Sequence, residues 1–142
     1  MDRVNIYTDG GARNNPGPAA IGVIFKNKKG QTIKQYSEYL GQMTNNQAEY
    51  QAIIFALRKA KGLKFKKVDC FSDSQFIVEQ LNHRYKIKEE GIIPLFIKVW
   101  NLMLSFNQVT FKHIPREKNK EADKLVNQVL KAKEKEKTLP GI

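Results

Sequence analysis

The chain of 142 residues is 41% hydrophobic and carries 25 lysine and arginine residues against 14 acidic residues, a formal net charge of +11. This length suits one domain with its own core, so we expect residues 1–142 to form a single domain, and the single cysteine, Cys70, excludes an intramolecular disulfide and any all-cysteine metal site. Because no stretch has the roughly 18 apolar residues of a membrane span or the apolar core of a signal peptide, we expect a cytoplasmic protein that does not contact membranes.

The N-terminal part of the chain predicts three strands joined by short turns. Residues 4–8 have β-branched and aromatic side chains, which favour a strand that ends at Asp9. Residues 10–18 are rich in glycine, asparagine and proline, as expected for a turn. Residues 19–27 and 32–40 predict the second and third strands, so the three strands form an antiparallel meander.

The middle of the chain predicts a helix, a strand and a second helix. Residues 44–46 offer helix caps, and residues 47–61 favour a helix that is apolar on nearly all sides, as expected for a helix lying on a sheet. Residues 67–72 predict a fourth strand and residues 75–82 a short helix. A strand that follows a helical crossover usually pairs in parallel, so we expect a mixed sheet.

The C-terminal part predicts a helix, a strand and a last helix. Pro94 begins a helix over residues 94–106, and residues 109–114 form the fifth strand. The last helix begins near Lys118, and residues 132–142 are expected to be a charged tail that frays. The element order β-β-β-α-β-α-α-β-α predicts an α/β fold in which helices cover a mixed sheet.

Four carboxylates fall at the junctions of these predicted elements. Asp9 ends the first strand, Asp73 follows the fourth strand, and Glu49 and Asp123 lie near the starts of two helices. Glu49 shares a helix face with apolar residues, so its side chain is expected to point inward. Each carboxylate also has an ordinary interpretation, because Asp73 could cap a helix while Glu49 and Asp123 could complement helix dipoles.

The four carboxylates together suggest a metal site. Packed closely, they would raise one another's pKa values unless cations compensate their charge. Oxygen ligands favour Mg²⁺ or Mn²⁺, and two such ions about 3.5 to 4 Å apart are a recurrent device for phosphodiester hydrolysis. The excess of basic residues suits nucleic acid as the partner, although a lysine-rich composition or solubility alone would also explain it.

Four sequence motifs, in the order of the predicted elements, resemble type 1 ribonuclease H over essentially the whole chain. The motifs are Thr8-Asp9-Gly10-Gly11 with Asn15-Pro16-Gly17-Pro18, Thr44-Asn45-Asn46-Gln47-Ala48-Glu49, Ser72-Asp73-Ser74, and the run from His113 to Asp123. The resemblance implies a ribonuclease H-like fold with a five-stranded mixed sheet and about four helices. It also implies hydrolysis of the RNA strand of an RNA–DNA hybrid, leaving a 5′-phosphate and a 3′-hydroxyl.

The resemblance assigns roles to the acidic residues. Asp9 should bridge two Mg²⁺ ions, for which Mn²⁺ should substitute, while Glu49 and Asp73 should each ligate one ion. Asp123 should complete the site partly through water. His113 matches a family histidine thought to help proton movement or product release, although it could merely pack or cap at the end of a strand.

The resemblance also implies contacts with the hybrid through its minor groove. The residues concerned are Gly10, Gly11, Ala12, Glu49 and Gln75 for the RNA strand, Asn15, Asn45 and Asn46 for base edges or sugars, Thr44 for a DNA phosphate, and Arg13 for phosphates in general. Arg116, where the chain departs from the best-known members, is also expected to contact phosphate. Turn and cap roles are the ordinary alternatives for these asparagine and threonine residues, and one residue can serve both purposes.

The sequence departs from the best-known bacterial members in two places. Residues 83–91 stand where those members have a long basic handle, and they mix acidic with basic side chains. Pro115 and Arg116 replace a glycine and a second histidine, a pattern nearer to the archaeal and Bacillus-like branch. Two alternatives stay open, namely a nuclease of the same fold acting on double-stranded RNA or junctions, and a non-catalytic nucleic-acid-binding module. We expect a monomer without an obligate protein partner.

Overall fold

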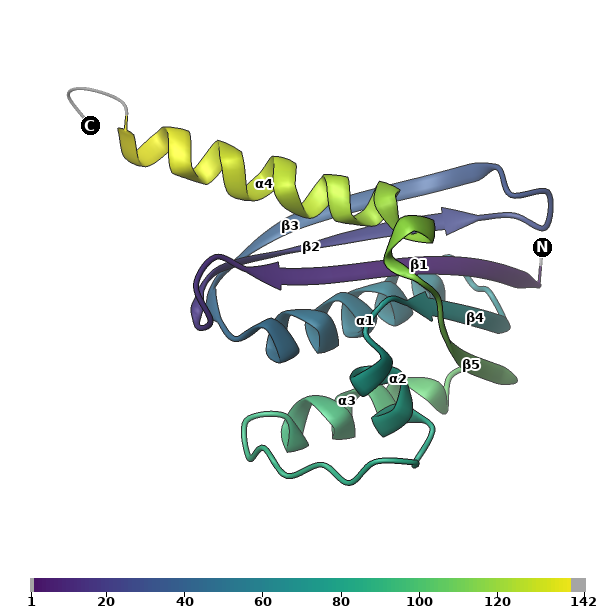
Figure 1. Cartoon of the computed structure of the whole chain (residues 1–142). Coiled ribbons are helices and arrows are strands. Elements are labelled where there is room, and N and C mark those ends of the chain that lie inside the picture. Colours follow the sequence, from purple (N-terminus) through teal and green to yellow (C-terminus); the bar gives the residue numbers. More distant parts are fainter. Residues whose placement is uncertain (1, 139–142) are drawn as a thin grey trace.

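A five-stranded mixed sheet forms the centre of the computed structural model, which describes residues 2–138 (Figure 1). The strand order is β3-β2-β1-β4-β5. The first three strands pair antiparallel, whereas β4 pairs in parallel with both β1 and β5, as the sequence predicts. The strands span Arg3–Ala12 (β1), Gly17–Lys26 (β2), Thr32–Met43 (β3), Lys67–Ser72 (β4) and Gln108–His113 (β5).

Helices cover both faces of this sheet (Figure 1). Helix α1 packs on β1 and β2 and is itself contacted by α3 and α2, and α4 crosses β1, β2 and β3 on the opposite face. No helix within residues 2–138 combines the length and the apolar character that crossing a bilayer would require. The helices span Asn45–Gly62 (α1), Gln75–Leu81 (α2), Ile93–Met103 (α3), Arg116–Lys118 (the 3-10 helix η1) and Lys120–Thr138 (α4).

The larger core lies between the sheet and α1. Ile6, Phe25 and Tyr50 are fully buried there, and the Tyr50 hydroxyl donates a 2.8 Å hydrogen bond to Oε1 of the buried Gln80. A smaller cluster, which includes Val126, fixes α4 to β2 on the other face. Two helices are therefore held rigidly against the same pair of central strands.

The structure corrects the predicted position of Asp9. Strand β1 does not end there but continues to Ala12, because its antiparallel ladder with β2 extends to the Ala12–Ala19 pair. The parallel ladder with β4 stops at the Thr8–Ser72 pair. Asp9 is therefore the first residue of β1 beyond the end of β4, so one side of the strand is open next to it.

The segment predicted to fray also begins as regular structure. Helix α4 continues without interruption to Thr138, through part of residues 132–142. The remaining positions of that prediction, residues 139–142, lie outside the described residues. Fraying of the tail therefore stays a prediction.

Candidate active site

Three of the four predicted carboxylates converge at the end of the parallel strands. Asp9 comes from β1, Glu49 from the first turns of α1 and Asp73 from the residue after β4. One oxygen of each lies within 4.8 Å of the others. Asp9 and Glu49 are each only 8% exposed. Residues that are distant in the sequence thus form one group of oxygen ligands.

Two glycines allow the helices to approach Asp9 from opposite faces. A Cβ atom at Gly10 would overlap the carbonyl oxygen of Ala48, so only glycine lets α1 lie this close to β1. The N–H of Gly10 then donates a 2.6 Å hydrogen bond to Oε1 of Glu49. A Cβ atom at Gly22, which pairs with Asp9, would likewise overlap the carbonyl oxygen of Ala122 in α4. The close approach of α4 carries Asp123 toward Asp9.

Asp123 stands at the edge of this group. It lies in the first turn of α4 and lines the same groove as the other three carboxylates, but it is outside the set whose oxygens lie within 4.8 Å of one another. Its charge and a hydrogen bond with Asp9 nevertheless raise the pKa of Asp9. The arrangement is a compact triad with a fourth acid beside it.

The electrostatics of the triad favour protonation or a bound cation. Burial raises the pKa of Asp9 to about 8, and the charges of Asp73 and Asp123 add to that shift. Burial also raises the pKa of Glu49 well above its usual range, and the charge of Asp9 adds to it. The N–H of Gly10 lowers both pKa values somewhat, and the positive charge of Arg116 lowers the pKa of Glu49. A set of clustered carboxylate oxygens with so little positive charge fits a hard divalent ion such as Mg²⁺ or Mn²⁺.

The triad opens into a polar groove of about 470 Å³ between α4, the β1–β2 hairpin and the start of α1. Besides the four carboxylates, the groove brings together most of the predicted substrate contacts, namely Gly10, Gly11, Ala12, Arg13, Asn45, Asn46 and Arg116. Four predicted residues are not among those lining it, namely Asn15, Thr44, Gln75 and His113. His113 ends β5 and Gln75 begins α2, and both side chains are exposed.

Turn and cap interactions hold one wall of the groove. The Thr44 hydroxyl caps α1 by accepting from the N–H of Gln47, whose side chain accepts from the N–H of Thr44. Asn15 Oδ1 accepts from the N–H of Asn45 at 2.9 Å, and Asn45 Oδ1 accepts from the N–H of Ala12 at 2.8 Å. The structural roles considered for these residues are therefore real, and they fix the hairpin against α1.

Asn119 is a site residue that the sequence did not reveal. It is 2% exposed, and its Nδ2 donates to the carbonyl of Thr8 at 2.8 Å and to Oδ2 of Asp73 at 3.1 Å. Its Oδ1 is buried and has no hydrogen-bond partner among the described residues. Asn119 thus connects β1, the Asp73 carboxylate and the start of α4. Its only sequence signal is its place four residues before Asp123, where an asparagine also suits a helix start.

Four further lining residues were also missed, although helical spacing could have found most of them. Three of them lie three, four and seven residues after Asp123 and so share its face of α4. The missed residues are Ser74, Val126, Asn127 and Leu130.

Comparisons with known proteins agree with this geometry. A family model described as reverse transcriptase-like matches residues 7–129. Ribonuclease HI of Halobacterium salinarum is 34% identical over 90% of this chain. A crystal structure of RNase H1 from that archaeon has a TM-score of 0.89 and covers 92% of this chain and 98% of its own. The chain belongs to the type 1 ribonuclease H family.

Two further relatives extend this comparison. LC11-RNase H1, in a structure with an RNA/DNA hybrid, is 43% identical, with a TM-score of 0.84, and covers 88% of this chain and 94% of its own. A bifunctional protein of Mycobacterium tuberculosis is 33% identical over 92% of this chain. This chain spans 64% of the Halobacterium relative's length and 36% of the Mycobacterium relative's length.

Proposed function

We propose that this chain hydrolyses the RNA strand of RNA–DNA hybrids with the help of two divalent metal ions, leaving a 5′-phosphate and a 3′-hydroxyl. The observation that carries the proposal is the convergence of Asp9, Glu49 and Asp73, with oxygens within 4.8 Å of one another, at the floor of an open polar groove. Relatives named ribonuclease HI, and a related structure that contains an RNA/DNA hybrid, support it.

In this proposal the buried carboxylates hold the metal ions and orient them. Asp9 would be a ligand of both ions, Glu49 and Asp73 would each hold one, and Asp123 would act from the edge through water. When bound, the ions activate the attacking water and stabilise the leaving 3′ oxygen. The Gly10 N–H fixes one oxygen of Glu49, and the amide of Asn119 fixes one oxygen of Asp73, so the other oxygen of each carboxylate is left for a metal ion.

The residues that surround the triad would position the hybrid. Backbone at Gly10, Gly11 and Ala12 lies in the groove, where the RNA strand must approach the metal ions. Arg13 is fixed at the rim by Glu134 and Asn127, and the exposed Arg116 faces the same space. Both guanidinium groups suit phosphate contacts that do not depend on base sequence.

Four predicted site residues lie outside the lining of the groove. We propose that Asn15, Thr44 and Gln75 contact the hybrid beyond the groove and that His113 assists proton movement or product release. Replacement of His113 by alanine separates this role from simple packing, because it should slow turnover with little change in the melting temperature. An equal loss of stability and activity would favour packing.

A substrate panel tests the proposed activity. Labelled RNA–DNA hybrid, double-stranded RNA and a four-way DNA junction are incubated with the protein and Mg²⁺ or Mn²⁺. Only the hybrid should be cut, and the cleaved RNA should carry the proposed end groups when probed with kinase and ligase. Preferential cleavage of either other substrate would show that the protein is a nuclease of the same fold with a different substrate.

Metal binding separates an enzyme from a non-catalytic binding module. Mn²⁺ should raise the melting temperature, because an ion that binds only the folded state stabilises it. Absence of both this shift and hybrid cleavage would favour the module. A sedimentation experiment tests the monomer that we expect, and a stable dimer would contradict it.

A further inference from the structure

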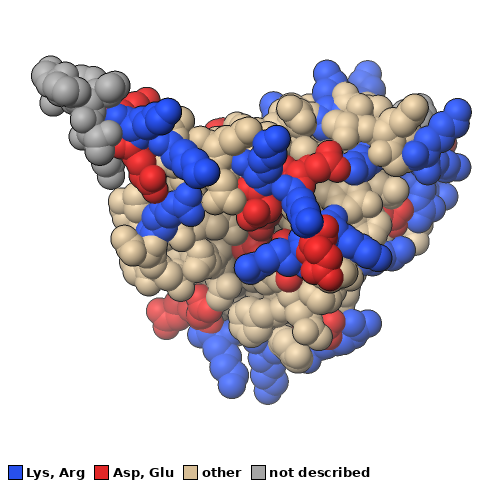
Figure 2. Space-filling view, turned by 45° about the horizontal axis from the view of Figure 1, so that its top comes forward, with Lys and Arg blue, Asp and Glu red and all other residues tan. Residues whose placement is uncertain are grey.

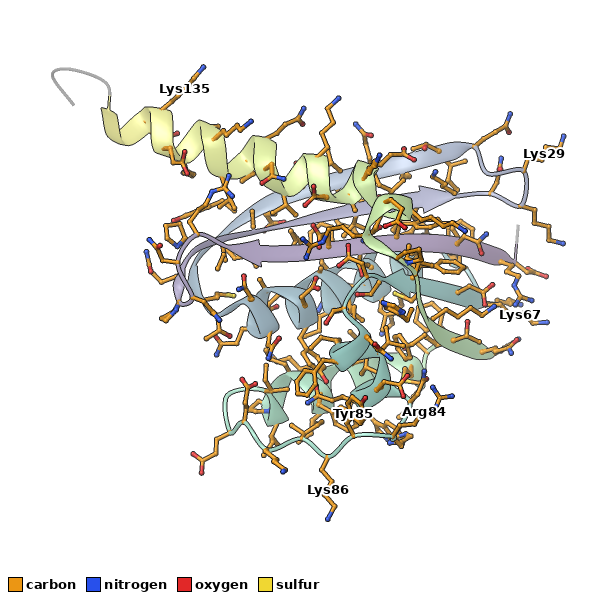
Figure 3. The ribbon with its side chains drawn as sticks, viewed as in Figure 1. Lys29, Lys67, Arg84, Tyr85, Lys86 and Lys135 are labelled. Atoms are coloured by element: carbon orange, nitrogen blue, oxygen red, sulfur yellow. The ribbon has the colours of Figure 1, made fainter. Side chains whose placement is uncertain are left out.

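A strongly basic surface lies away from the groove. Residues 58–67 contain six cationic side chains and no acidic one, and the β2–β3 turn adds two lysines. We call this surface the basic pole, and its members are Lys28, Lys29, Arg58, Lys59, Lys61, Lys64, Lys66 and Lys67. Lys and Arg atoms crowd this end of the molecule at the upper right of Figure 2, and Figure 3 shows Lys29 and Lys67 at the same end of the sheet.

The course of the chain separates the basic pole from the groove. Strand β4 starts at the pole with Lys67 and reaches the groove only at Asp73. Helix α1 has Glu49 near one end and Lys61 near the other, a distance of about 18 Å at roughly 1.5 Å per residue. None of the pole residues is among those lining the groove. The pole is therefore a second surface and not an extension of the active site.

The charges of the basic pole are not neutralised by neighbouring acids. Within residues 2–138, none of its eight cations forms an ion pair with a carboxylate. By contrast, Arg13 at the groove rim pairs with Glu134, and Lys26, next to the β2–β3 turn, pairs with Glu121. A dense group of unpaired like charges suits a polyanion, because binding relieves their repulsion and releases counterions.

An aromatic hollow adjoins the basic pole. It has a volume of about 600 Å³, and its lining includes Tyr36, Phe55 and Lys59, with Glu38 as the one acid. The Lys59 ammonium lies 5.4 Å from the centre of the Tyr36 ring and 5.3 Å from that of Phe55. Leu63, 43% exposed, also lines the hollow. Cations beside aromatic rings are what proteins use to hold the phosphates and bases of single-stranded nucleic acid.

We propose that the basic pole and its hollow bind single-stranded RNA or DNA independently of the groove. Lysines of the pole contact the phosphates, and bases reach the aromatic rings when the flexible Lys59 side chain moves aside. A substrate with a single-stranded flank is then held at two places, which compensates for the mixed charge of residues 83–91. This surface does not require that the groove be catalytic.

Binding to labelled single strands in EDTA tests the proposal without cleavage. The double variant Lys61→Gln/Lys66→Gln removes two exposed charges from the pole, and Lys98→Gln/Lys131→Gln removes two exposed charges elsewhere. Fluorescence anisotropy with a 20-nucleotide RNA and the matching DNA should show at least about a fivefold loss of affinity for the pole variant and less than twofold for the control. The salt slope should fall by about 0.7 for each lost phosphate contact.

Cleavage of a short blunt hybrid in Mg²⁺ separates this proposal from the proposed function. The pole variant should cut it at the unaltered rate, because neither lysine lies in the groove. If the unaltered protein cuts no hybrid but binds single strands through the pole, the proposed function fails and this inference stands. Equal losses in both variants, or no single-strand binding, would overturn the inference. Pole-dependent binding to anionic phosphatidylserine vesicles without single-strand binding would overturn it as well.

Discussion

Two buried aspartates on the neighbouring strands β4 and β1 behave in opposite ways. Asp69, in β4, is 6% exposed and accepts hydrogen bonds from Arg3 Nε at 2.7 Å and from the hydroxyl of Thr110. The hydrogen bond from Arg3 lowers the pKa of Asp69 below its usual range. Asp9, six residues beyond Arg3 on β1, is nearly as buried, yet its pKa rises to about 8.

The difference between these two regions is that one acid has a cationic partner and the others do not. Asp69 has a cationic partner, Arg3, so its negative charge stabilises the folded state. Asp9 and Glu49 receive a backbone N–H and repel other carboxylates, so their charges oppose folding until a cation arrives. Functional sites commonly reduce stability in this way.

The replacement Asp9→Asn should have the largest effect on cleavage and should act on stability in the opposite direction to a loss of Asp69. It should reduce hybrid cleavage by about 10³-fold or more, because it removes the proposed shared metal ligand. Each tenfold loss of rate corresponds to about 1.4 kcal/mol of transition-state free energy. The same change should raise the melting temperature in EDTA, since it removes buried repulsion. Gel-based cleavage rates and thermal unfolding check both effects. Retained cleavage would refute the bridging role.

The pH dependence of stability in EDTA should differ in sign between the two regions. The pKa of Asp9 is about 8 in the folded protein and about 3.9 in the unfolded chain, so the stability that its protonation provides is complete below pH about 4 and is lost as the pH rises through about 8. Asp69 has a lowered pKa, so its contribution is present above pH about 4 and is lost as the pH falls below that value.

Urea unfolding across this pH range measures both contributions. Asp9→Asn should flatten the decline on the alkaline side, whereas Asp69→Asn should flatten the decline on the acidic side. Saturating Mg²⁺ should abolish the alkaline decline, since a bound cation favours the ionised carboxylates. A stability that rises steadily from pH 5 to pH 8.5 in EDTA would mean that burial and repulsion do not raise the pKa of Asp9.

The replacement Asn119→Ala should weaken metal binding without removing a ligand. Loss of the amide frees the Asp73 carboxylate and should raise the Kd for Mn²⁺ by about 10- to 100-fold, the range typical of residues that orient metal ligands. Thermal shift in a Mn²⁺ titration measures this directly. Cleavage should recover at high Mn²⁺ concentration with an unchanged KM for the hybrid. Failure of added metal to restore activity would indicate a collapsed site.

The sequence predicts most of this architecture because its signals are local. Strand periodicity, helix caps and the crossover rule predict the element order and the mixed sheet, and the motif order predicts the acids that meet. The position of Asp9 within β1 escaped prediction because it depends on where the ladder with β4 stops, at Thr8. That end point is set by pairing between distant strands, so the residues near Asp9 carry no local signal for it.

The partners of buried polar groups were equally hidden in the sequence. Asn119 bonds to the carbonyl of Thr8 across 111 positions, and Arg3 reaches Asp69 across 66. Neither pair has a spacing that a helix or a strand would explain. An acid in a strand, such as Asp69, therefore looks the same in the sequence as an acid in a metal site until the fold supplies its neighbours.

The replacement Arg3→Met should have the smallest effect of these changes, and it tests whether Asp69 depends on its cationic partner. It leaves Asp69 with the Thr110 hydroxyl and the more distant charge of Lys112 but without a hydrogen-bonded cation, so the melting temperature should fall by roughly 3 °C at neutral pH while the Kd for Mn²⁺ is unchanged. Arg84→Met is the matched control, because it breaks a pair with Glu79 in which the arginine side chain is 64% exposed, and it should shift the melting temperature by less than about 1 °C. Differential scanning calorimetry resolves these shifts. Equal shifts would mean that Asp69 depends on Arg3 no more than Glu79 depends on Arg84, and the two regions would then differ only in how crowded their acids are.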